Sequence, residues 1–332
     1  MLANTIISEW KKNVYKPVYW LEGEEEYFID KVMNYAESYI LNESETAFNL
    51  AVFYGKDADW ISVINSCCRY PMLAEKQVVL LKEAQQMRDI EKLEAYIENP
   101  LASTIFVVSY KEKKVDGRTR LAKLLKEKGV VLTTKKLYDN QLPEWTEELV
   151  QAKEHAISQK ALMLLVDHIG NDLSRIENEI DKILINLSNR KTITEEDVEK
   201  YVGVSKDFNV FELQAALATK NLPKAIQIIQ YFEANPKVAP IQLILPSLYS
   251  FFSKVFMIYG LNTRDEKTAA ASLSINPFFI KDYLKASSIY SYPEVERLIL
   301  LLSEYNLKSI GINSVNNTDA ALLKEMVVKM IA

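Results

Sequence analysis

Residues 60–82 read WISVINSCCRYPMLAEKQVVLLK and place a helix, a corner and a buried strand in direct succession. Five apolar residues recur at the spacing of one helical face: Trp60, Val63, Ile64, Cys67 and Cys68. This spacing predicts a helix over about 58–69 with that face buried. Pro71 lacks an N–H and biases Tyr70 away from the α region, so the helix ends there. The apolar run 78–81 then predicts a fully buried strand.

The corner between this helix and strand carries two bulky apolar residues, Met72 and Leu73, with Pro71 before them and charged residues soon after. One interpretation is that both are folded under the domain, because most apolar residues near the end of an element are core. The other is an exposed tip that enters a partner's pocket, since methionine adapts its shape and a small apolar anchor can dominate an interface. The residues alone leave both interpretations open.

Outward from this stretch, the first part of the chain alternates strands with helices. The predicted strands are 17–21, 48–53, 78–81, 104–109 and 130–133, and the predicted helices are 24–40, 58–69, 90–98 and 118–127. Five strands interleaved with four helices predict a parallel, doubly wound sheet with helices on both faces.

The remainder reads as helical, so the predicted fold class is α/β plus all-α. A polar segment, 135–143, serves as a linker, and a capping box at 194–197 opens the last helix of a small bundle. A second break at 203–209 precedes a long apolar helix over 240–259 and a final helix capped by Thr318. The predicted domains are 1–140, 141–208 and 209–332.

Composition describes a folded, helix-rich protein: of 332 residues, 48% are apolar, 26% are charged and only 8 are glycine. No run of about 18 apolar residues and no signal-peptide pattern is present, so we expect no membrane association and a cytoplasmic location. The net charge of −5 excludes a general polyanion binder and restricts any nucleic-acid contact to a local patch.

The sequence offers no catalytic or metal-binding constellation. Cys67 and Cys68 are adjacent, which suits neither a disulfide nor a metal site, and we expect both to be core residues. His155 and His168 match no metal-ligand spacing. We therefore predict no catalytic residue, no metal and no cofactor.

The turn at 22–26 reads EGEEE and lies between the first strand and its helix, where a nucleotide-binding domain carries its phosphate loop. The pattern G-x-x-x-x-G-K-[ST] is missing there and elsewhere in the chain. Carboxylates suit the positive end of a helix, but they would repel a triphosphate. We interpret the turn as a degenerate phosphate loop that does not hydrolyse ATP.

A basic segment, 111–120, follows a central strand, at the sheet edge where α/β proteins hold ligands. Its candidates for DNA contact are Lys113, Lys114, Arg118 and Arg120. A solvated charged loop is the alternative.

Four places in the sequence together resemble one family. They are VYWLEGEEEYFI (18–29), YPMLAEKQVV (70–79), GNDLSRIENEIDKI (170–183), and NVFEL (209–213) with Ala225 and NPFFIK (276–281). In their order and spacing they resemble the clamp-loader subunits of the AAA+ superfamily, and among them the delta-subunit family of bacterial DNA polymerase III.

This resemblance implies a function without intrinsic ATPase activity, inside a DNA polymerase (nucleotidyltransferase) holoenzyme. Met72 and Leu73, flanked by Tyr70, Pro71 and Ala74, would enter a hydrophobic pocket of the sliding clamp (the beta subunit) and help to open the ring. The third domain would join the other clamp-loader subunits in the collar of a heteropentamer, with primer-template DNA below. Many relatives carry phenylalanine where this chain has the smaller Leu73.

Two other classes of function remain open on the sequence. One is an active AAA+ ATPase with an unusual phosphate loop, which nucleotide-binding calorimetry would reveal. The other is a helical adaptor or nucleic-acid-binding module unrelated to replication, which failure to bind a clamp would favour.

Overall fold

The computed structural model describes residues 2–187, 190–205, 208–236, 240–261, 265–275, 279–312 and 318–331. The landmark residues 276–278 lie outside these ranges. The chain folds into two compact units, residues 1–137 and 138–332. The predicted division into three domains, at 140 and 208, stays a prediction.

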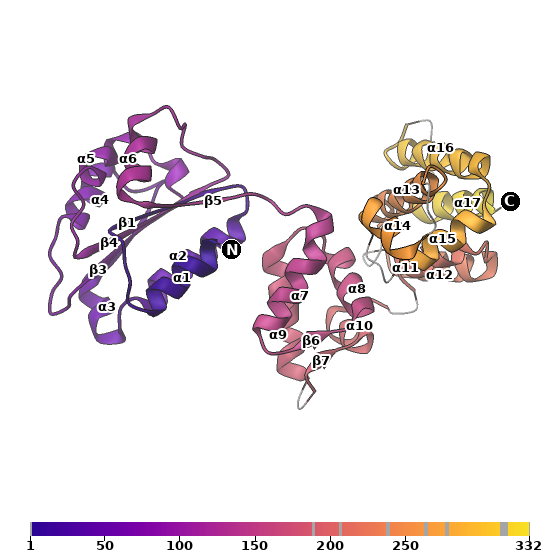
Figure 1. Cartoon of the computed structure of the whole chain (residues 1–332), viewed down its shortest axis with the longest axis horizontal. Coiled ribbons are helices and arrows are strands. Elements are labelled where there is room, and N and C mark those ends of the chain that lie inside the picture. The colour runs from indigo at the N-terminus through magenta and orange to yellow at the C-terminus, as the bar shows by residue number, and fades with distance from the viewer. Residues whose placement is uncertain are drawn as a thin grey trace. The chain divides into compact units, whose positions relative to one another are not determined.

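The first unit is built on a five-stranded parallel sheet with the order β2-β3-β4-β1-β5 (Figure 1). Its strands are β1 (Val18–Gly23), β2 (Leu50–Tyr54), β3 (Gln77–Lys82), β4 (Thr104–Lys111) and β5 (Val130–Thr134). The three central strands, β1, β3 and β4, are almost entirely buried. The predicted fold class, a doubly wound parallel sheet followed by helical parts, is confirmed.

Helices cover both faces of the sheet because successive strand residues point to opposite sides. Tyr19 and Leu21 belong to the core under α1 and α2, whereas Val18 and Trp20 belong to the core under α4, α5 and α6. Figure 1 shows these two helical layers on either side of the strands. The helices of this unit are α1 (Leu2–Lys11), α2 (Glu26–Tyr39), α3 (Glu43–Asn49), α4 (Trp60–Cys67), α5 (Glu94–Ile97) and α6 (Arg120–Lys128).

Several sequence expectations about this unit need correction. Cys68 is exposed rather than core, because it caps α4 one residue beyond the buried Cys67 and so points to a different side. The helix expected at 90–98 is a 3-10 turn (Ile90–Leu93) followed by the short α5. Helices α1 and α3 were not predicted.

The second unit begins with short helices around a two-stranded parallel ladder that the sequence did not predict. Its elements are α7 (Leu142–Ala152), β6 (Ala156–Ile157), α8 (Gln159–Ile169), α9 (Leu173–Asn186), β7 (Thr192–Ile193) and α10 (Glu195–Val202). Pro143 lies in the first turn of α7 rather than in a linker, a place where its missing N–H costs nothing. The capping box of α10 is confirmed, with Thr194 N–H donating to the Asp197 carboxylate at 2.9 Å.

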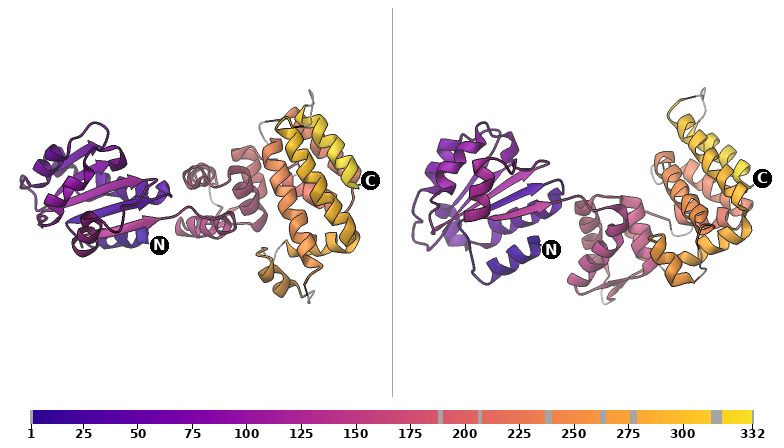
Figure 2. Two further views of the ribbon diagram at one scale, coloured as in Figure 1. Left: turned by 90° about the horizontal axis from the view of Figure 1, so that it is seen from above. Right: turned by 45° about the horizontal axis from the view of Figure 1, so that its top comes forward.

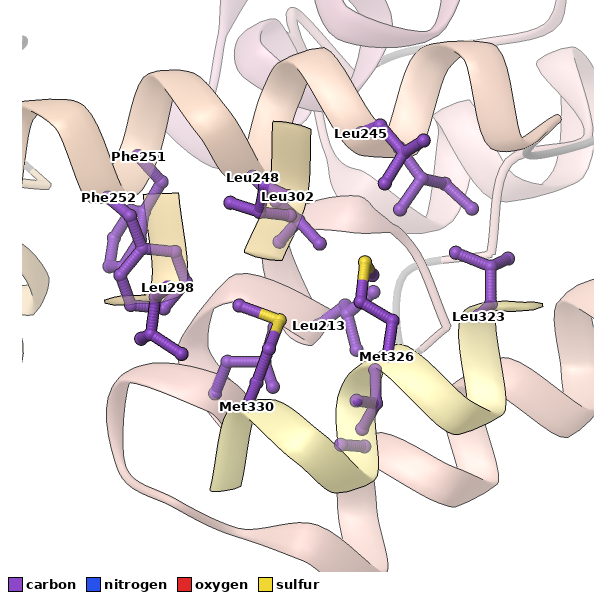
Figure 3. Packing of buried hydrophobic residues seen from close by; sticks show 14 of the residues in the cluster. Leu213, Leu245, Leu248, Phe251, Phe252, Leu298, Leu302, Leu323, Met326 and Met330 are labelled. Carbon is purple, nitrogen blue, oxygen red and sulfur yellow. The ribbon is translucent and has the colours of Figure 1, made fainter. Parts of the chain in front are cut away.

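Seven further helices follow among the described residues of the second unit. They are α11 (Val210–Ala218), α12 (Leu222–Ala234), α13 (Ile241–Ile258), α14 (Glu266–Ser272), α15 (Ile280–Ile289), α16 (Tyr292–Ser309) and α17 (Asp319–Ile331). The orange and yellow helices run side by side in Figure 2, and α13 packs against α16, which packs against α17. Figure 3 shows Leu245, Leu248 and Phe252 of α13 facing this shared core.

Helix α13 is long and apolar enough to cross a membrane by length and composition alone, with a hydropathy of 1.5. One face of the helix, including Ile244, Leu248 and Phe252, is buried among the other helices of the unit. Its place in a packed core accounts for the apolar composition of α13, because a buried core helix can be as long and as apolar as a membrane span.

Candidate functional site

The carboxyl ends of β1 and β4 form the topological switch point of the sheet. These strands are neighbours, but α2 follows β1 onto one face while α6 follows β4 onto the other. In doubly wound sheets, ligands bind where connections diverge in this way. The edge is therefore the place to test for a nucleotide site.

Gly23 ends β1 with φ +127°, and a Cβ at this position would lie 2.2 Å from the Thr134 carbonyl oxygen of β5. The glycine thus allows the turn to pack against β5. The next turn residues start α2: Glu25 is its N-cap, and its carboxylate accepts a hydrogen bond from Tyr27 N–H at 3.3 Å. The predicted capping of this helix by a carboxylate is confirmed. The N-terminus of α2, where a nucleotide-binding domain would hold phosphate, is thus already bound by a carboxylate of the protein itself.

Lys111, at the end of β4, is the one basic residue of segment 111–120 that points into the acidic part of this edge. Its Nζ lies 2.8 Å from Asp30, 3.1 Å from Glu26 and 3.1 Å from Glu83. Partial burial acts to lower the pKa of Lys111, but hydrogen bonds to Asp30, Glu83 and Glu26 outweigh it and raise the pKa. A triphosphate would have to compete with three carboxylates for this ammonium group.

Glu22 fixes the loop that follows β4. Its buried carboxylate accepts hydrogen bonds from Val115 N–H at 3.0 Å and from Thr133 Oγ1 at 3.3 Å. At the switch point the protein's own carboxylates thus pair with Lys111 and with the loop after β4, whereas a phosphate site requires several free donors.

The predicted DNA-contact residues lie on the same loop and at the start of α6, but they do not form one uncompensated patch. Lys113 and Lys114 are exposed. The guanidinium of Arg118 lies 2.7 Å from Asp116, and that of Arg120 lies 2.7 Å from Glu98. DNA contact by these four residues stays a prediction.

The corner between α4 and β3 lies at the opposite, amino edge of the sheet. There Leu73 is 100% exposed, Met72 is 53% exposed and Tyr70 is 78% exposed, while Pro71 and Ala74 are half-buried. The interpretation that Met72 and Leu73 are folded under the domain is wrong. Residues 70–74 form an exposed apolar projection, which we call the tip.

Buried polar side chains, which the sequence reasoning missed, hold the corner around the tip. Gln77, the first residue of β3, donates through Nε2 to the carbonyl oxygens of Ser66 at 3.2 Å and Arg69 at 2.5 Å, and to Thr104 Oγ1 at 2.8 Å. Asn49, the last residue of α3, contacts the Met72 backbone. The sequence did carry a signal for the buried Gln77, because it is a polar residue directly before the apolar run of β3.

Leu73 has a left-handed backbone, with φ +54°. For a residue with a branched side chain this conformation costs about 1–2 kcal/mol, and it persists only where neighbouring contacts enforce it. An exposed leucine in a strained conformation stabilises nothing within the fold, so packing does not explain its place on the surface.

Comparisons with known proteins agree with this architecture. Residues 19–135 match the family model described as DNA polymerase III, delta subunit. The chain is 25% identical over 314 residues to the DNA polymerase III subunit delta of Bacillus subtilis, covering 90% of both chains. It is 24% identical over 321 residues to the probable DNA polymerase III subunit delta of Aquifex aeolicus, covering 90% of this chain and 89% of the relative.

Among solved structures, the fold is similar to that of the Bacillus subtilis DNA clamp loader delta protein. The TM-score is 0.56 at 23% identity, with 99% of both chains covered. The comparisons confirm the resemblance seen in the sequence: the chain is similar to DNA polymerase III delta subunits over most of its length.

Proposed function

We propose that this chain is the clamp-loader subunit that binds the sliding clamp through its tip and opens the ring, without hydrolysing ATP itself. The single observation that carries the proposal is the exposure of Met72 and Leu73 on a corner anchored by buried hydrogen bonds. Similarity to DNA polymerase III delta subunits and to a DNA clamp loader delta protein supports a sliding clamp as the partner.

The tip would act as a rigid apolar anchor. Met72 and Leu73 bury their side chains in a hydrophobic pocket of the clamp, and Tyr70, Pro71 and Ala74 pack around that pocket's rim. A closed ring is in equilibrium with an open one, and a ligand that binds the open form better shifts the population towards it. Opening therefore requires only differential affinity, which a preorganised apolar tip can provide.

Energy from ATP would come from neighbouring subunits. At the switch point of this chain, Glu26, Asp30 and Glu83 surround Lys111, an arrangement that disfavours a triphosphate. The helices from α11 onward would join the other subunits of a heteropentamer, and primer-template DNA would lie within that assembly.

The test is release of clamp rings already closed around circular DNA, measured with the full chain alone and no ATP. The wild-type chain is expected to release the rings, whereas a Met72→Ser, Leu73→Ser variant of normal circular dichroism leaves them in place. Release that requires added ATP, or that survives the double substitution, would contradict the proposal.

A further inference from the structure

Asn49 is a buried side chain beside the tip that the proposed function does not yet use. It is only 4% exposed and ends α3. Its Oδ1 accepts a hydrogen bond from Met72 N–H at 2.7 Å, and its Nδ2 donates to the Met72 carbonyl oxygen at 2.9 Å. One carboxamide thus pairs with both polar groups of the Met72 backbone, although the two residues are 23 positions apart.

The carboxamide is itself fixed. Nδ2 also donates to the Glu45 carbonyl oxygen at 3.1 Å, one turn earlier in α3. The start of that helix is closed by a capping box in which Asn42 Oδ1 accepts from Glu45 N–H at 3.0 Å. Asn49 therefore links the tip to α3, just as Gln77 links the corner to the end of α4.

We infer that Asn49 is the positioning residue of the tip: it holds the Met72 backbone so that Leu73 projects into solvent before any partner arrives. This inference rests on the proposed function. Only a carboxamide presents a donor and an acceptor side by side in this way. Preorganisation raises affinity by reducing the conformational freedom lost on binding, so the benefit appears in clamp binding.

The experiment compares the affinity of full-length variants for the cognate clamp by surface plasmon resonance. Asn49→Leu removes both bonds to Met72 while keeping a branched side chain with the same number of heavy atoms, and it is expected to weaken binding about 10- to 100-fold. The matched control is Gln214→Leu, which likewise replaces a buried carboxamide by an apolar side chain but removes hydrogen bonds to Ser247 in the second unit and none to the tip. Its affinity is expected to stay within about twofold of wild type.

A merely structural role is separated by a double-mutant cycle and by hydrogen exchange. In a Leu73→Ala background, Asn49→Leu is expected to weaken binding by less than about threefold, because the Leu73 side chain that Asn49 positions is already missing. The Met72 amide of the free Asn49→Leu variant is expected to exchange faster than in wild type. If Asn49→Leu does not fold, Asn49→Ser, whose hydroxyl is too short to bridge both groups, takes its place.

Two results overturn the inference in different ways. If Asn49→Leu binds the clamp as wild type does while Met72→Ser, Leu73→Ser abolishes binding, the proposed function stands and Asn49 has no positioning role. If the wild-type chain itself does not bind the clamp, both proposals fall.

Discussion

Leu73 combines two unfavourable properties at one residue, full exposure of an apolar side chain and a left-handed backbone. Neither stabilises the folded chain, which fits a residue selected for what it does to a partner. The residue types of the corner are visible in the sequence. The contact that fixes its conformation is not visible there, because Asn49 and Met72 are 23 positions apart and no local pattern pairs them.

Gly23, in the turn between β1 and α2, is a glycine that the packing of the fold requires. An added Cβ would lie 2.2 Å from the Thr134 carbonyl oxygen, and φ is +127°. Gly23→Ala is therefore expected to lower the free energy of unfolding by about 2–4 kcal/mol, measured by urea denaturation.

Gly117→Ala is the matched control for that change. A Cβ there meets nothing within 4 Å, so stability is expected to change by less than about 0.5 kcal/mol. Equal stability of the Gly23→Ala variant and wild type would contradict this packing argument.

At the scale of elements, long periodic segments were predictable and short ones were not. The strands of the large sheet and the apolar faces of α13 and α17 follow from period and composition. Helix α3 has seven residues and no full apolar stripe, although its capping box, Asn42 to Glu45, was a usable signal. The two-residue strands β6 and β7 depend on a pairing that no local pattern specifies.

The start of α16 provides a prediction about pH. Glu294 closes its capping box with Ser291 and lies 2.8 Å from Lys220, which precedes α12. The hydrogen bond from Lys220, followed by those from Ser291, lowers the pKa of Glu294 to about 2. A lowered pKa stabilises the folded state above the unfolded-state value of 4.5, and this contribution is lost as pH falls towards 2.

Glu294→Gln is therefore expected to lower the free energy of unfolding by about 1 kcal/mol at pH 7. This value is reduced to allow for the partial exposure of the carboxylate. The difference in the free energy of unfolding between this variant and wild type, measured by urea denaturation, should become smaller at pH 3. Glu304→Gln, which breaks an exposed pair with Lys308 on the same helix, should cost less than about 0.5 kcal/mol. A Glu294→Gln effect that is unchanged between pH 7 and pH 3 would contradict the electrostatic explanation.

At the scale of the whole molecule, the direction of the strands keeps the apolar tip apart from the basic loop. Because the sheet is parallel, the tip before β3 and the basic loop after β4 lie at opposite edges of the first unit. The proposed clamp site and any phosphate contact by that loop are thus spatially distinct. The sequence could predict both segments, but not that Glu22 anchors the loop from 93 residues away or that carboxylates surround Lys111.

The most direct test of the central claim is the dissociation constant of the full chain for its cognate sliding clamp, measured for wild type and for Met72→Ser, Leu73→Ser. Loss of two hot-spot side chains should cost several kcal/mol, which weakens binding by at least about 100-fold. A control double variant, Ile185→Ser, Leu300→Ser, changes residues of the second unit that are 83% and 67% exposed and should bind like wild type. Tight binding that survives the tip substitutions, or no binding by the wild-type chain, would contradict the account.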